Sequence, residues 1–107
     1  MSIDVSLTET LPTEIYWANI THNLGDMAEE AGIYKHLWHP SELGITKARE
    51  LIDPLTKGLD LMKSDPQRFE KHNAKNGWGM YENFVPFVEN YRDACVKNPD
   101  SQISVSI

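Results

Sequence analysis

The sequence has few of the features that mark a disulfide-bonded, membrane-spanning or nucleic-acid-binding protein. Its 107 residues include one cysteine, Cys95, which excludes an internal disulfide, disfavours a cysteine-based metal site and suits a small core residue. No apolar run approaches the roughly 20 residues that cross a bilayer. Lys and Arg number 10 against 16 Asp and Glu, and the net charge of −6 argues against binding to long nucleic acid, which depends on a basic surface. We therefore expect one domain with neither a membrane nor a long nucleic acid as partner.

The sequence also lacks the usual signatures of catalysis and of cofactor binding. No serine or cysteine stands in a nucleophile elbow, and no glycine-rich phosphate loop is present. The four histidines, His22, His36, His39 and His72, lack the spacing of a zinc site. His22 and Asp26 are four residues apart, which suits an acid–base pair on one helix face but is also common on ordinary helix surfaces. The first residues lack the basic and apolar regions of a signal peptide. We expect a cytoplasmic protein with no catalytic residue, metal or cofactor.

Both ends of the sequence alternate apolar and polar residues, which is the period of a half-buried strand. The two ends are therefore predicted to pair as an antiparallel ribbon, to which residues 14–17 could add. A two-stranded ribbon is marginal by itself and needs helices to cover it. The alternating apolar residues are Ile3, Val5 and Leu7 at one end and Ile103, Val105 and Ile107 at the other.

The densest apolar pattern lies in residues 19–31, where apolar residues recur at helical spacing. Leu24 and Met27 belong to the apolar face of this predicted helix, and Gly32 would end it in the left-handed conformation. Gly25 would cost about 1 kcal/mol relative to alanine inside the helix, so a neighbouring chain or ligand is expected to approach there.

Two longer helices are predicted to follow. Apolar residues at helical spacing predict one over residues 45–62, which Pro54 would either kink or break and restart. The other is predicted to begin near residue 82 or 83, so that Pro86 falls in its first turn, and to stop before residue 98. The sequence therefore predicts a single α+β domain over residues 1–107, with three main helices packed with a small antiparallel strand pair formed by the N- and C-termini.

Large aromatic residues gather at the ends of these predicted elements, with short polar residues beside them. Such a combination can stack a planar ligand and hydrogen-bond its edges, although the tryptophans could equally fill a small core. Amides at the start of the helix over residues 19–31 would attract a phosphate, with Arg49 as the nearest cation. The predicted ligand-binding residues are Trp17, Asn19, Thr21, His22, Asn23, Arg49, Asn76, Trp78 and Tyr81.

Two motifs carry a resemblance to known proteins: Ala-Asn-Ile-Thr-His-Asn-Leu at residues 18–24 and Asn-Gly-Trp-Gly at residues 76–79. Through them the chain resembles a family of small uncharacterised proteins encoded by bacteriophages and prophages. The resemblance extends along nearly the whole chain, through Met27-Ala28, residues 31–34, Leu37-Trp38, Pro40, residues 54–56, Gly58-Leu59, Asp65-Pro66 and Pro99-Asp100.

The resemblance implies a phage protein that acts in the cytoplasm of the infected bacterium. Small acidic phage proteins without enzymatic activity often act against host defence, by sequestering a nucleotide signal or by blocking a host protein. With the polar and aromatic residues above, we expect a non-catalytic protein that binds a nucleotide-like host defence signal. The alternatives are an inhibitor that binds a host defence protein directly and a small hydrolase that uses His22. Self-association is left open.

Overall fold

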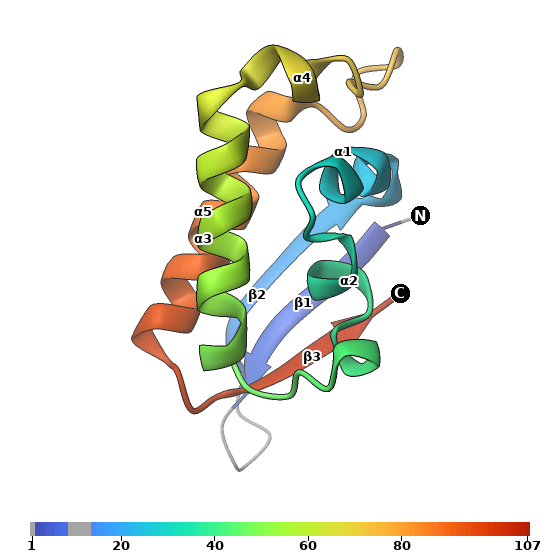
Figure 1. The fold of residues 1–107 in the computed structure, drawn as a ribbon. Coiled ribbons are helices and arrows are strands. Elements are labelled where there is room, and N and C mark those ends of the chain that lie inside the picture. The colour runs from blue at the N-terminus through green and yellow to red at the C-terminus, as the bar shows by residue number, and fades with distance from the viewer. Residues whose placement is uncertain (1, 9–13) are drawn as a thin grey trace.

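The chain folds as an α+β protein in which helices cover one face of a three-stranded antiparallel sheet (Figure 1). The structure, a computed structural model, describes residues 2–8 and 14–107. None of the helices within these residues is long and apolar enough to cross a bilayer. In chain order the elements are β1 (Ser2–Thr8), β2 (Glu14–Thr21), the 3-10 helix η1 (His22–Leu24), α1 (Gly25–Glu30), α2 (Tyr34–Trp38), the 3-10 helix η2 (Pro40–Leu43), α3 (Arg49–Ser64), α4 (Pro66–Glu70), α5 (Tyr81–Lys97) and β3 (Gln102–Ser106).

The predicted pairing of the two ends is confirmed, with β1 in the middle of the sheet. The strand order is β2-β1-β3, and Val5 of β1 lies opposite Ala18 of β2 and Val105 of β3. Alternate residues of β1, beginning with Ile3, are fully buried against the helices. The residues between them, such as Ser6, lie on the opposite face with Trp17 of β2. This second face is polar, and it leaves Trp17 56% exposed.

The helix predicted over residues 19–31 is wrong in its first half. Asn19, Ile20 and Thr21 complete β2, where they pair with the start of β1. The extended chain still buries Ile20, because alternate residues of a strand point to the same face. The helix α1 starts at Gly25, where the Tyr34 ring comes within 3.4 Å of the position that a Cβ atom would take. The close approach predicted at this glycine is therefore present.

Two long helices, α3 and α5, lie side by side along the sheet (Figure 1). The helix α3 is unbroken from Arg49 to Ser64, so the restart considered at Pro54 does not occur. The helix α5 begins at Tyr81, which places Pro86 just beyond its first turn rather than within it. Each proline leaves one carbonyl of the preceding turn without its helical donor. The predicted apolar faces are confirmed and include the buried residues Leu51, Leu55, Leu59 and Met62 of α3 and Phe84, Val88, Tyr91 and Cys95 of α5.

Candidate ligand-binding site

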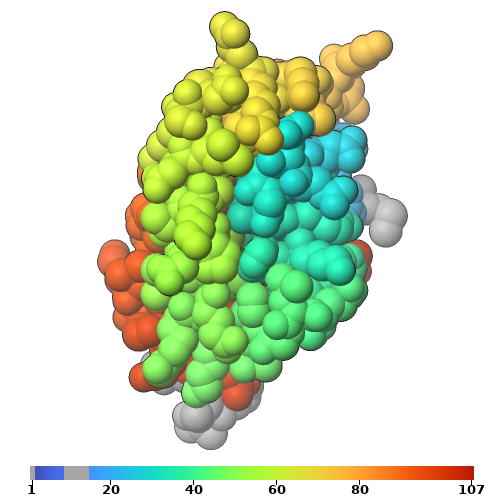
Figure 2. All heavy atoms as spheres, in the orientation of Figure 1, coloured from blue at the N-terminus to red at the C-terminus, as the bar shows by residue number. Residues whose placement is uncertain are grey.

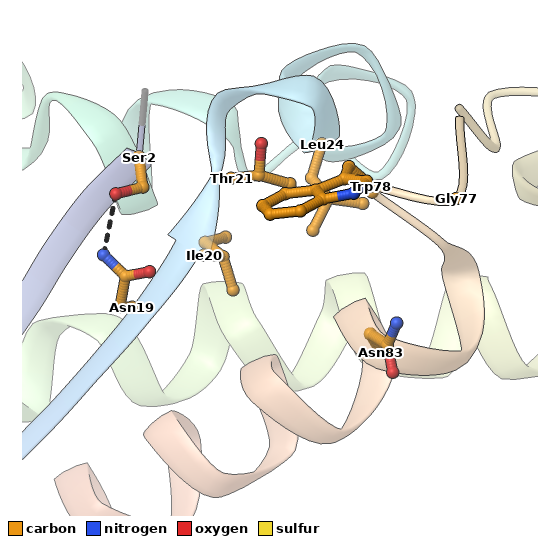
Figure 3. Close-up of a pocket in the computed structure, with 9 residues that line it drawn as sticks. Ser2, Asn19, Ile20, Thr21, Leu24, Gly77, Trp78 and Asn83 are labelled. Atoms are coloured by element: carbon orange, nitrogen blue, oxygen red, sulfur yellow. Dashed lines mark hydrogen bonds between the residues drawn. The ribbon is translucent and has the colours of Figure 1, made fainter. Parts of the chain in front are cut away.

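A hollow of about 460 Å³ opens where β2 passes into η1, beside the loop that precedes α5 (Figure 3). Its volume falls within the range of roughly 300–1,000 Å³ that small-molecule sites occupy. The loop belongs to the segment between α4 and α5, which projects from one end of the molecule (Figures 1 and 2). The residues that line the hollow are Ser2, Asn19, Ile20, Thr21, Leu24, Gly77, Trp78, Gly79 and Asn83.

The Asn-Gly-Trp-Gly loop is held by hydrogen bonds that fix its backbone and leave its tryptophan outside. The side-chain oxygen of Asn76 accepts a bond of 3.0 Å from the Trp78 amide. The Asn23 side chain donates a bond of 2.8 Å to the Trp78 carbonyl, so residues distant in sequence anchor the loop. Gly77 and Gly79 have φ values of +79° and +115°, which favour glycine. The result is a loop anchored through its backbone, whose Trp78 side chain is 70% exposed.

The hollow combines an apolar floor with neutral polar groups. Ile20 and Leu24, both almost fully buried, form its base. Figure 3 shows the Trp78 ring reaching toward them from the loop, with Asn83 on α5 across the hollow. The Asn19 amide nitrogen donates to the Asp4 carboxylate at 2.5 Å, to Ser2 Oγ at 2.9 Å and to the Ile3 carbonyl at 3.1 Å. The Asn19 amide oxygen has no bond to a described residue. No lysine or arginine is among the residues that line this hollow.

Five of the nine predicted ligand-binding residues line this hollow or hold its loop. Asn19, Thr21 and Trp78 line the hollow, and Asn23 and Asn76 hold its loop. Thr21 also accepts a bond of 3.3 Å from the Asn23 amide, which caps η1. The sequence analysis missed the other lining residues. Asn83 could have been suspected from its position next to the Asn-Gly-Trp-Gly motif, whereas nothing local in the sequence pointed to Ser2.

Four predicted residues, among them His22, neither line the hollow nor hold its loop, and the helix start predicted as a phosphate site is absent from residues 19–21. The amides of residues 19–21 belong to a strand rather than to a helix start. Arg49 lies at the first turn of α3, where it forms an ion pair with Asp100. Trp17 points from the polar face of the sheet. The Tyr81 hydroxyl donates a bond of 2.8 Å to the Met62 carbonyl, and burial raises the pKa of Tyr81; its role is to join α5 to α3.

Two side chains with catalytic potential, His22 and Cys95, are respectively hydrogen-bonded and buried. His22 Nδ1 accepts a bond of 2.7 Å from the indole nitrogen of Trp38, which places its ring proton on Nε2. No hydrogen bond or ion pair joins His22 to Asp26, the partner expected from the sequence. Burial raises the pKa of the Cys95 thiol to about 12, which leaves it protonated and a poor nucleophile at neutral pH. Within residues 2–8 and 14–107, no three His, Cys, Asp or Glu side chains gather as a metal site.

Comparisons with protein-family models, with curated proteins and with solved structures found no match to this chain. The geometry of the hollow therefore carries the functional argument.

Proposed function

We propose that this protein binds a planar, nucleotide-like ligand in the hollow below Trp78 and holds it without converting it. The observation that carries the proposal is a large, exposed indole at a hollow whose base is formed by Ile20 and Leu24, with hydrogen-bonding groups around it. Stacking of a base on an aromatic side chain contributes about 1–3 kcal/mol, and every base offers a flat face for it. The tethered backbone at residues 76–79 supports this use, because it keeps Trp78 beside the hollow.

The residues around the hollow favour recognition of the base and sugar over the phosphate. A ring stacked on Trp78 would rest against Ile20 and Leu24, with its edges near the Thr21 hydroxyl and the Asn83 amide. None of the described residues that line the hollow is a lysine or arginine, so we expect the phosphate groups of a nucleotide to extend into solvent. This arrangement replaces the helix-start phosphate site that the sequence predicted.

We further propose that the protein is phage-encoded and that binding sequesters a host defence signal. The resemblance to phage proteins supports the setting. The buried Cys95 and the engaged His22 support binding over hydrolysis, since sequestration requires affinity alone.

The test is a thermal shift assay with nucleosides, mono- and dinucleotides and cyclic nucleotides. We expect at least one base to raise the melting temperature, increasingly with ligand concentration, as linkage requires. A nucleoside and its monophosphate should give similar shifts in melting temperature, because no lysine or arginine is among the described residues that line the hollow. Trp78→Ala should remove the shift and leave the free protein folded. Trp17→Ala is the matched control, because it removes an exposed indole outside the hollow.

Two outcomes would contradict the proposal. One is the absence of a shift with every ligand of the panel while a host protein co-purifies with the chain, which would favour direct inhibition. The other is equal loss of binding in Trp17→Ala and Trp78→Ala, which would move the site away from the hollow.

A further inference from the structure

The strand β3 has an outer edge that the rest of the described chain covers only at its beginning. The Ile103 amide donates a bond of 3.0 Å to the Thr46 carbonyl, and Lys47 bridges to Gln102. In an antiparallel sheet the amide and carbonyl of one residue point to the same side, and the side alternates along the strand. The backbone amide and carbonyl of Val105 therefore point away from β1, as those of Ile103 do. Neither Val105 group has a backbone partner on that side among the described residues.

A groove of about 600 Å³ runs beside this open edge. In Figure 1, η2 and the chain that follows it flank β3 on the side away from β1. Both walls of the groove offer apolar surface, and on the β3 side the apolar residues alternate with serines. The apolar residues are Trp38, Pro40 and Ile45 on one wall and Ile103, Val105 and Ile107 on the other. An extended segment added to β3 could place every second side chain on this surface.

The charge of the groove favours an acidic occupant. Lys47 is the one lysine or arginine that lines it, and the Lys47 side chain forms no ion pair with a described residue. His39, also in the lining, faces the Glu42 carboxylate at 3.6 Å. The Glu50 carboxylate accepts bonds from the amides of Thr46 and Lys47. In a chain of net charge −6, the groove thus contains a lysine that none of the described carboxylates pairs with.

We propose that this groove binds an extended peptide segment of a partner protein by strand addition to β3. The segment would have apolar alternate residues on the groove side and a carboxylate close to Lys47. In such recognition the backbone bonds supply affinity and the alternate side chains supply specificity. A second copy of this chain paired through β3 is the alternative occupant, which light scattering distinguishes. The inference is independent of the Trp78 hollow.

The test uses three fluorescein-labelled pentapeptides in anisotropy titrations. Val-Asp-Val-Asp-Val has the proposed alternation and charge, Val-Lys-Val-Lys-Val reverses the charge, and Val-Val-Val-Asp-Asp keeps the composition of the first but not its alternation. We expect the first peptide to bind and the other two to bind at least about tenfold more weakly. The lysine peptide loses the charge-assisted contact with Lys47, and the third peptide no longer places an apolar side chain at every second position on the groove.

Two variants locate the site. Val105→Pro removes the outward amide and spares the ladder with β1, since proline is accepted at sheet edges; it should weaken binding about tenfold, and Ser104→Ala should not. Lys47→Glu changes an exposed residue and should reverse the preference to the lysine peptide. Equal binding of the acidic and lysine peptides, binding unchanged in Val105→Pro, or no binding at all would overturn the proposal. A dimer in light scattering that Val105→Pro dissociates would also overturn it, because a second copy would then be the occupant.

Discussion

Gly79 is the most constrained single residue of the Trp78 loop. Its φ is +115°, and an added Cβ atom would lie 2.8 Å from the Asn23 Cβ. Gly77 has a similar φ of +79° but open space around it. Positive φ alone costs about 1–2 kcal/mol for a residue with a side chain. We therefore expect Gly79→Ala to lower the free energy of unfolding more than Gly77→Ala does in urea titrations. Equal losses would mean that Asn23 moves aside without cost.

One tyrosine hydroxyl in α5 has a hydrogen-bond partner and another has none within the described part of the chain. Substitution of each tyrosine by phenylalanine should therefore change the free energy of unfolding differently. The Tyr91 hydroxyl is buried with no hydrogen-bond partner among the described residues, and burial raises the pKa of Tyr91 far above its usual range. Tyr91→Phe should leave the free energy of unfolding unchanged or raise it, since an unpaired buried hydroxyl is unfavourable. Tyr81→Phe loses the bond to Met62 and should cost about 0.5–1.5 kcal/mol. Chemical denaturation of both variants measures the contrast, and a marked loss in Tyr91→Phe would contradict it.

At the scale of elements, the Glu30 carboxylate joins α1 to α4 and the residues after it. Arg68 bonds to it at 2.8 Å, His72 at 3.3 Å and Lys71 lies at 3.4 Å. Chiefly through Arg68, then His72, these partners lower the pKa of Glu30 from 4.5 to about 2. A carboxyl whose pKa is lower in the folded than in the unfolded state stabilises the fold fully when the pH is above the pKa of the unfolded state. This contribution is lost as the pH falls through the pKa of the folded state. The relevant window is therefore from about pH 4.5 down to about pH 2.

Glu30→Gln should lower the melting temperature at neutral pH and make it less dependent on pH within that window. Melting curves at a series of pH values measure both effects. Glu29→Gln, in the same helix at an exposed position, is the matched control and should retain the dependence of the natural protein. A Glu30→Gln curve parallel to that of the natural protein would contradict this role for the carboxylate.

The spacing of apolar residues in the sequence was sufficient to predict some secondary-structure elements and not others. The terminal strands were predicted because alternation with period two is a local signal for a half-buried strand. Residues 19–21 were assigned to a helix because Ile20 continues the spacing of Leu24 and Met27. The pairing that makes them extended comes from residues 2–4, far from them in sequence. The helix α3 passes through Pro54 because packing of its buried face outweighs one lost hydrogen bond.

At the scale of the whole molecule, the candidate site combines segments that the sequence keeps far apart. Thr21 and Trp78 could be predicted from the sequence as site residues, because their side chains are chemically suited to binding a ligand. Ser2 and Asn83 could not, since only the sheet and the packing of α5 bring them to the hollow. Arg49 was misplaced for the same reason: its distance from the strand end depends on where α3 begins along the sheet.

The central position of β1 has a consequence for how the protein folds and opens. β1 and β2 are neighbours in sequence, whereas β3 comes from the far end and closes a very long loop when it pairs with β1. Contacts of such long sequence separation form slowly, because the entropy of loop closure is lost before they stabilise the chain. As an edge strand that is joined last, β3 is expected to detach in the smallest opening fluctuations, which hydrogen exchange detects as early loss of amide protection. Each such opening would expose the backbone groups of β1 that pair with β3, while β1, β2 and the long helices stay folded.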